Sequence, residues 1–229
     1  MTSWTTPHEL FKPRRRFFIL LLALLSMLFG PVFIPDRLEG VVGPIFFTAV
    51  LVAALAAVAR TTLVMVIGAV FAVIGCGLLV FTSSRDVVAL GATAAAVAIL
   101  FLGFASVAIL RYVLRADHVD SGVILAALCV YMLAAVICGE SYVLMDLLDP
   151  GSFRYPSPSE VAGHRSVLYY FSFITVTTVG YGDISPVSAL ARATAATEAV
   201  VGQFYLVVLV ARLVGLHTAH EARNRGLGV

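Results

Sequence analysis

The chain has 229 residues, of which 61% are hydrophobic and 12% charged, and its mean hydropathy is +1.02. A soluble domain is about half apolar and a quarter charged. These values exclude an ordinary soluble domain and predict an all-α integral membrane protein. The formal net charge of +2 gives no reason to expect a nucleic-acid partner. The three cysteines lie within apolar runs, which argues against a disulfide framework or a metal site.

Six apolar segments are long enough, at about 20 residues, to cross a bilayer as helices. In chain order they are residues 17–34, 41–59, 61–81, 87–110, 121–148 and 190–216. We interpret the first as a retained span, although its charged start and apolar run also fit a secretory signal peptide. With both termini in the cytoplasm, most Lys and Arg fall on the inner side of a plasma membrane, as expected for cytoplasmic loops.

These segments predict four regions along the chain. Residues 1–16 form a cytoplasmic N-terminus, and residues 17–116 form a scaffold of four transmembrane helices. Residues 117–216 form a pore domain, and residues 217–229 form a short cytoplasmic tail.

A short apolar segment lies between the last two spans. Residues 165–177, RSVLYYFSFITVT, would reach only about 20 Å as a helix, which is too short to cross a bilayer. Irregular backbone at membrane depth is tolerated only where protein buries it or where it lines a water-filled cavity. The segment therefore predicts a re-entrant helix that ends part-way through the membrane.

The motif TVGYGD follows this helix. Gly180 and Gly182 permit positive φ at alternate positions, so successive carbonyls can turn to one side. The side chains of Val179 and Tyr181 would then point away from the carbonyls and pack as a supporting cuff. Such a column of carbonyls, with the Thr178 hydroxyl below it, can replace the hydration shell of a cation. One chain supplies one wall, so the pattern predicts a symmetric oligomer.

The motif TTVGYGD, preceded by a short aromatic helix and flanked by two spans, resembles the selectivity filter of potassium channels. The resemblance covers roughly residues 123–216 and implies a tetramer in which each chain lines the potassium sites. The implied filter residues are Thr178, Val179, Gly180, Tyr181 and Gly182, and K⁺ is bound at the first four. The implied filter supports are Asp183, Tyr170 and Thr177. Some bacterial relatives carry Glu at the position of Ile174, so an inactivation that depends on that Glu is not expected here.

The sixth span resembles the inner, cavity-lining helix of these channels. Gly202 stands where relatives have a hinge glycine, but it could equally serve close helix packing. Gln203 is a candidate for the cavity wall. Glu198 either lies on the ion pathway or is hydrogen-bonded behind the filter near Thr194 or Thr197. We expect Glu198→Gln to change gating or conductance more than assembly.

The fourth span does not have the pattern of a voltage sensor. Sensors carry Arg or Lys at every third position, whereas residues 87–110 contain neither. Arg111 and Arg115 follow the span as interfacial charges. We therefore predict weak voltage dependence. His118, His217 and His220 lie near the predicted inner face, where they could act as a pH switch or simply be solvated.

The sequence thus predicts a tetrameric channel that conducts K⁺ passively, with K⁺ as the transported ion and no organic cofactor. Its predicted partners are three more copies of itself and membrane lipids, and an unidentified regulatory partner is compatible with the sequence. The alternatives are a non-conducting regulatory subunit and a less selective cation channel. An uptake transporter would need four pore repeats in one chain. A membrane enzyme would have to use Glu140, Glu198 or a histidine, none of which belongs to a catalytic cluster.

Overall fold

The computed structural model describes residues 13–33, 36–58, 88–156 and 165–226. Its elements are, in chain order, α2 (Pro13–Phe29), the 3₁₀ helix η1 (Gly30–Phe33), α3 (Asp36–Val58), α5 (Val88–Leu114), α6 (Ser121–Leu148), β1 (Phe153–Arg154), α7 (Arg165–Val176), β2 (Ser185–Pro186) and α8 (Ala189–Gly226). The predicted third span, residues 61–81, lies outside the described residues. The predicted re-entrant helix corresponds to α7.

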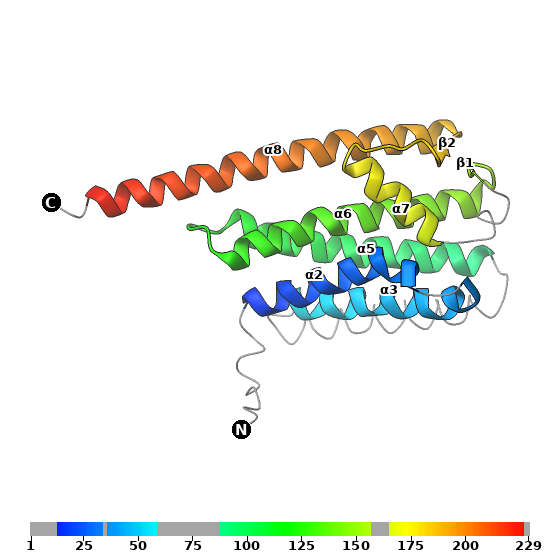
Figure 1. The fold of residues 1–229 in the computed structure, drawn as a ribbon, viewed down its shortest axis with the longest axis horizontal. Helices are drawn as coiled ribbons and strands as arrows, with labels where there is room; N and C mark the ends of the chain where they lie inside the picture. The colour runs from blue at the N-terminus through cyan, green and yellow to red at the C-terminus, as the bar shows by residue number, and fades with distance from the viewer. Residues whose placement is uncertain (1–12, 34–35, 59–87, 157–164, 227–229) are drawn as a thin grey trace, which may run out of the picture.

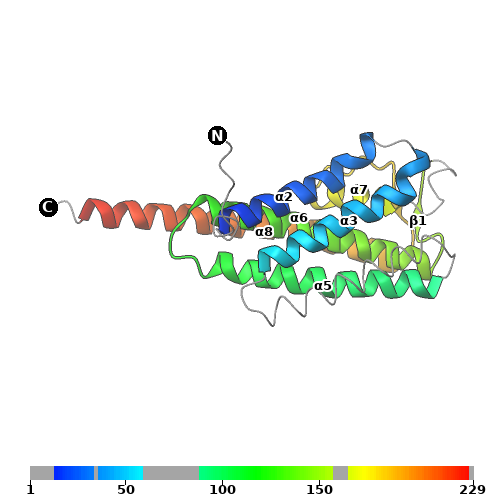
Figure 2. The same cartoon turned by 90° about the horizontal axis from the view of Figure 1, so that it is seen from below.

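The long helices lie roughly along one direction (Figures 1 and 2). α5 and α6 are antiparallel neighbours, α2 and α3 cover one side of them, and α8 runs along the opposite side. The short helix α7 is inclined between α6 and α8 (Figure 1). The pore region predicted from the sequence therefore forms one edge of the helical bundle.

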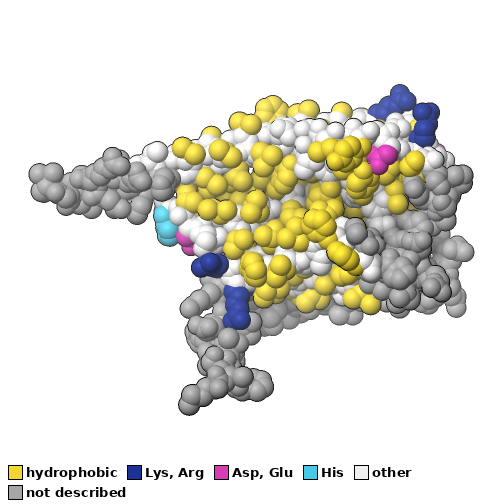
Figure 3. Space-filling model, in the orientation of Figure 1, with side chains coloured by type: hydrophobic (Ala, Val, Ile, Leu, Met, Phe, Trp, Pro, Cys, Tyr) yellow, Lys and Arg dark blue, Asp and Glu magenta, His cyan; other side chains and the backbone are white. Residues whose placement is uncertain are grey.

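Three described helices are long and apolar enough to cross a membrane: α5, α6 and the Ala189–Leu216 part of α8. They correspond to the fourth, fifth and sixth predicted spans. The first two predicted spans correspond to α2, which has 17 residues, and to α3, whose apolar stretch is Gly43–Val58. In the space-filling view, apolar side chains cover the middle of the face while Lys and Arg lie toward its ends (Figure 3).

A short connection joins α5 to α6 and makes them a helical hairpin. Asp120 is the N-cap of α6, and its side chain accepts a hydrogen bond of 2.8 Å from the backbone N–H of Val123. This bond satisfies one of the N–H groups that the first turn of a helix leaves without a partner. Because only residues 115–120 separate the two helices, α5 continues directly into the predicted pore region.

Helix α8 is longer than the predicted sixth span. It continues ten residues beyond Leu216, to Gly226, into the region that we predicted as a short tail. Alanine, glutamate and arginine, which favour helix, are frequent in this extension. Gly202 and Gly215 both lie inside this one continuous helix.

Two apolar cores hold the bundle together. The larger lies among α2, α3, α5 and α6 and includes the fully buried Leu20, Leu51 and Leu133. The smaller lies behind α7, where the rings of Tyr142, Phe153 and Phe171 pack edge to face with centroids 5.2–5.6 Å apart. Aromatic rings favour this edge-to-face arrangement because it brings the positive edge of one ring to the negative face of another. The smaller core therefore fixes α7 against α6 and the strand β1.

Candidate functional site

The backbone after α7 alternates in the sign of φ. The φ angle is +60° at Thr178, +49° at Gly180 and +80° at Gly182. The two glycines adopt the conformation that the sequence predicts for them. Thr178 also has a positive φ, although a β-branched residue rarely adopts one. Two bonds hold it there: its N–H donates to the carbonyl of Thr175 at 2.9 Å, and its hydroxyl donates to the carbonyl of Thr177 at 2.7 Å.

The start of this segment is tied to the end of α7. The N–H groups of Val179 and Gly180 both donate to the carbonyl oxygen of Ile174, at 2.9 and 3.1 Å. This carbonyl belongs to the last turn of α7, where helical carbonyls otherwise lack partners. The position of the segment therefore depends directly on the position of α7.

The side chains that we expected to form a cuff are open in the single chain. Val179 is 51% exposed and Tyr181 is 73% exposed. Within one chain, the described residues therefore cover only part of these two side chains in residues 178–182, which we call the glycine segment. A cuff around it would have to be completed by other copies.

The far end of the segment is braced through Asp183. Tyr170 of α7 donates a hydrogen bond of 2.9 Å to one carboxylate oxygen of Asp183, which is the pairing that the resemblance implies. The other oxygen accepts from the N–H of Ile184 at 3.0 Å. Thr177, the third implied support, donates instead to the carbonyl of Phe173 in α7 at 2.7 Å.

A two-stranded sheet connects the loops on either side of α7. β1 pairs antiparallel with β2, and the carbonyl of Ser152 accepts the N–H of Val187 at 2.7 Å. Nearby, Tyr155 donates a bond of 2.9 Å to Asp146. Burial, together with the neighbouring Asp146, raises the pKa of the Tyr155 hydroxyl, so this hydroxyl stays protonated and remains a donor.

Glu198 of α8 lies behind α7 and is only 6% exposed. Its carboxyl group accepts a hydrogen bond from the Tyr142 hydroxyl of α6 and another from the Ser172 hydroxyl of α7. Both partners differ from Thr194 and Thr197, the neighbours that we expected from the sequence. Thr197 donates to the carbonyl of Ala193 in its own helix. The carboxyl therefore joins three helices.

Gly202 of α8 lies against the end of α7, with no room for a side chain. A Cβ built there would lie 2.7 Å from the Cγ2 atom of Val176 and 3.0 Å from its carbonyl oxygen. A similar contact occurs on the other side of α7, where a Cβ at Gly139 would lie 2.4 Å from the ring of Tyr169. These distances favour the packing role that we considered for Gly202. Gln203, the candidate cavity residue, is exposed in the single chain.

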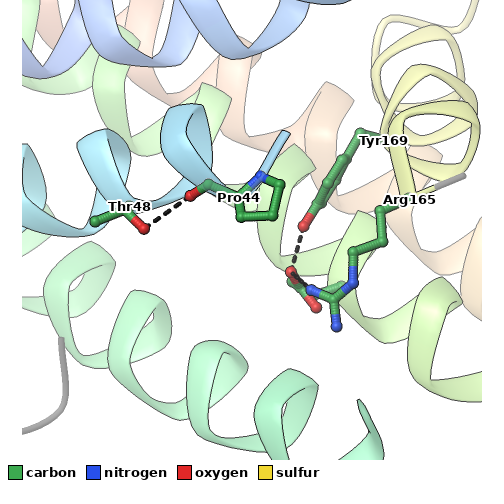
Figure 4. A network of polar contacts seen from close by, with 5 residues as sticks. Pro44, Thr48, Arg165 and Tyr169 are labelled. Atoms are coloured by element: carbon green, nitrogen blue, oxygen red, sulfur yellow. Dashed lines mark hydrogen bonds and ion pairs between the residues drawn. The ribbon is translucent and has the colours of Figure 1, made fainter. Parts of the chain in front are cut away.

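The start of α7 is anchored by a buried acid on α6. Glu140 is fully buried, accepts a hydrogen bond from Tyr169, and forms an ion pair of 3.0 Å with Arg165. Figure 4 shows Tyr169 and Arg165 converging on this carboxylate beside α3, where Thr48 donates to the carbonyl of Pro44. From the sequence, we considered Glu140 only as a residue that a membrane enzyme could use. The feature of the sequence that could have identified Glu140 as a buried anchor is its position as an ionisable residue in the middle of a span.

The C-terminal half of α8 is bound to the hairpin of α5 and α6. Tyr205 donates to the carbonyl of Ala127 in α6 at 2.7 Å. Arg212 donates to the carbonyls of Leu114 and Ala116, at the end of α5, at 2.6 and 3.2 Å. A cation at the C-terminal end of a helix is favourable because the unpaired carbonyls there carry partial negative charge. No feature of the sequence pattern predicts this contact.

Two comparisons with known proteins found a match to this chain. Residues 123–218, which run from α6 into the last part of α8, match the model of a family described as ion channel. Protein LctB of Geobacillus stearothermophilus is 41% identical over 84 residues. The match covers 34% of this chain and 62% of that relative, so it spans less than two thirds of the relative's length. No solved structure matches the chain.

Proposed function

We propose that this chain, whose residues 123–218 match the ion channel family, forms a potassium-selective channel of four identical copies in the plasma membrane. The observation that carries the proposal is the alternation of positive φ at Thr178, Gly180 and Gly182 within the TVGYGD motif. Alternating φ lets consecutive carbonyl oxygens turn to the same side of the strand. A ring of such strands offers a dehydrated cation the oxygen ligands that replace its water shell.

The exposed surface of α8 supports assembly around a central axis. Many of its apolar side chains are exposed in the single chain, as are Val179 and Tyr181. The exposed apolar residues there are Val200, Val201, Phe204, Val207 and Val208. Closed symmetric oligomers bury the same patch in every copy, and a filter needs several walls. Four copies meet both requirements and agree with the resemblance.

The scaffold supports weak voltage dependence. Residues 88–110 of α5 contain no Arg or Lys, and Arg111 lies in the last turn. Moving one charge through the membrane field is worth about 2.3 kcal/mol per 100 mV, so a helix without such charges gains little from the field. α5 is also joined to α6 by a few residues only and bonded to α8 through Arg212. These features favour a helix that stays in place.

The experiment that tests the proposal is ion flux into liposomes that contain the purified protein, with sodium as the competing ion. We expect K⁺ to enter far faster than Na⁺, and Gly180→Ala to abolish this flux. A Cβ at Gly180 meets nothing within 4 Å in the chain, so the effect would come from the φ of +49°. This conformation costs a residue other than glycine about 1–2 kcal/mol.

Gly103→Ala on α5 is the matched control. A Cβ there also meets nothing within 4 Å, and its φ is helical, so flux should not change. Equal entry of Na⁺ and K⁺ would favour the less selective cation channel. Stable tetramers without flux would favour a non-conducting subunit. Equal effects of the two alanine variants would refute the assigned filter.

A further inference from the structure

We propose that Glu198 is a positioning residue for the filter: its carboxyl group fixes α7 between α6 and α8 and so holds the glycine segment in its conducting geometry. The inference rests on the proposed function and adds to it a residue that never contacts the ion. It arises from the junction that Glu198, Ser172 and Tyr142 form behind the filter.

The contacts of Ser172 place this junction in the middle of α7. Its hydroxyl is fully buried, lies 2.6 Å from the carbonyl oxygen of Ala135 in α6, and bonds to one oxygen of the Glu198 carboxyl. The other oxygen of that carboxyl accepts the hydroxyl of Tyr142. Both oxygens of Glu198 are therefore used, and each leads to a different helix.

Other hydrogen bonds that join α7 to a long helix lead to α6. Tyr169 and Arg165 bond to Glu140 at the start of α7, and Tyr131 donates to the carbonyl of Val176 at its end, at 2.9 Å. The bond between Ser172 and Glu198 instead reaches α8. It therefore links the helix that leads into the filter to α8 as well as to α6.

A displacement at Ser172 would reach the filter within a short distance. Ile174 lies two residues further along α7, which is about 3 Å of helix rise. Its carbonyl oxygen holds the N–H groups of Val179 and Gly180. Because a helix moves as a stiff unit over one turn, a shift of Ser172 also moves this carbonyl and the start of the glycine segment.

Burial explains why an acid can serve here. An ionisable group in the hydrocarbon region is costly unless its polar atoms are bonded, and this carboxyl is bonded at both oxygens. Removing it would take away the acceptor of the Tyr142 hydroxyl, and it would leave Ser172 bonded to the Ala135 carbonyl of α6 but no longer to α8. Glutamine has the same shape, and its amide can accept from Tyr142 and donate to Ser172. If geometry is what matters, Glu198→Gln should preserve much of the function that Glu198→Ala loses.

The test compares Glu198→Ala, Glu198→Gln and Ser172→Ala with the natural chain. Two quantities are measured: the ratio of K⁺ to Na⁺ flux into liposomes, and the rise in unfolding temperature that K⁺ produces in the purified protein. The second reports ion binding by the filter without requiring flux. Ser141→Ala is the matched control, since that half-buried hydroxyl bonds only to the carbonyl of Ile137 in its own helix.

We expect Glu198→Ala and Ser172→Ala to lower the flux ratio at least about fivefold, as the loss of a buried hydrogen bond implies. Both should also reduce the stabilisation by K⁺. In both quantities, Glu198→Gln should stay closer to the natural chain than Glu198→Ala does. Ser141→Ala should equal the natural chain. Because Ser172→Ala removes a single oxygen, it keeps the test valid if Glu198→Ala fails to assemble.

The outcomes separate this inference from the proposed function. A natural chain without K⁺-selective flux or K⁺-dependent stabilisation would overturn the proposed function, and this inference with it. A selective natural chain whose Ser172→Ala and Glu198→Ala variants keep both quantities would overturn the inference alone. So would equal losses in Glu198→Gln and Glu198→Ala, because the geometry of the junction would then not be the cause.

Discussion

Replacing Gly202 by alanine should destabilise the folded chain because it forces α7 and α8 apart. The new Cβ would lie 2.7 Å from Cγ2 of Val176, whereas carbon atoms in favourable contact are about 3.5–4.0 Å apart. Relief by rotation is difficult, since Val176 is β-branched and only 2% exposed. Relief by backbone movement is opposed by the bond from Tyr131 to the Val176 carbonyl.

Overpacking of this kind costs about 1–3 kcal/mol. In a chain of this size each kcal/mol corresponds to roughly 2–4 °C in the unfolding midpoint, so Gly202→Ala should lower the midpoint by several degrees. The assay is thermal unfolding of the purified protein in detergent. Gly215→Ala on the same helix is the control, because a Cβ there meets nothing within 4 Å.

A second variant separates packing from hinge motion. Adding Val176→Ala to Gly202→Ala removes the atom at 2.7 Å and should restore part of the lost stability, although the contact of 3.0 Å with the carbonyl oxygen remains. If Gly202 were only a hinge, alanine would alter the flux and leave the midpoint as in Gly215→Ala. That result would refute the packing argument.

Two further predictions each concern one side chain and its hydrogen bonds, the first beside the filter and the second in α8. Tyr170→Phe removes the bond to Asp183 and should lower the ratio of K⁺ to Na⁺ flux by about two- to tenfold, as one lost hydrogen bond implies. The control is Tyr155→Phe, which removes a similar bond to Asp146 away from the filter. Equal flux ratios in the two variants would contradict this prediction. Arg212→Gln removes bonds to the carbonyls of Leu114 and Ala116 and should lower the free energy of unfolding by roughly 1–3 kcal/mol, and with it the unfolding midpoint, while the flux ratio stays unchanged. The comparison is with Arg115→Gln, at the same end of α5, and equal midpoints would show that the Arg212 bonds add nothing.

The glycine segment could be predicted from the sequence because glycine has a specific backbone property. Gly180 and Gly182 adopt the positive φ that their residue type allows. Thr178 could not be predicted in this way, because its intrinsic preference opposes the conformation that it adopts. Its φ is fixed by bonds to Thr175 and Thr177, which exist only once α7 has ended at the right place.

The partners of buried polar groups were the least predictable part of the site. The depth of Glu198 in its span indicated that its carboxyl needed partners. The sequence could not show that they are Ser172 and Tyr142, because hydropathy does not reveal which helix faces which. Three long helices agree with predicted spans in position, since composition and length decide such segments. Helix α8 exceeded its prediction because helix propensity does not stop where the apolar residues do.

The contact between α2 and α6 has a consequence for any attempt to isolate the last two spans as a minimal pore. Gly122 and Cys129 of α6 lie against the backbone of Arg14 and Phe17, at the small side chains that let two helices approach closely. Lipid tails are as apolar as these residues, so a shortened chain would still insert, but flexible tails would pack poorly where the backbone of α2 meets these small side chains. α2 therefore supplies a shape that a bilayer cannot replace, and removing it would disturb the packing of α6 before it affected the filter.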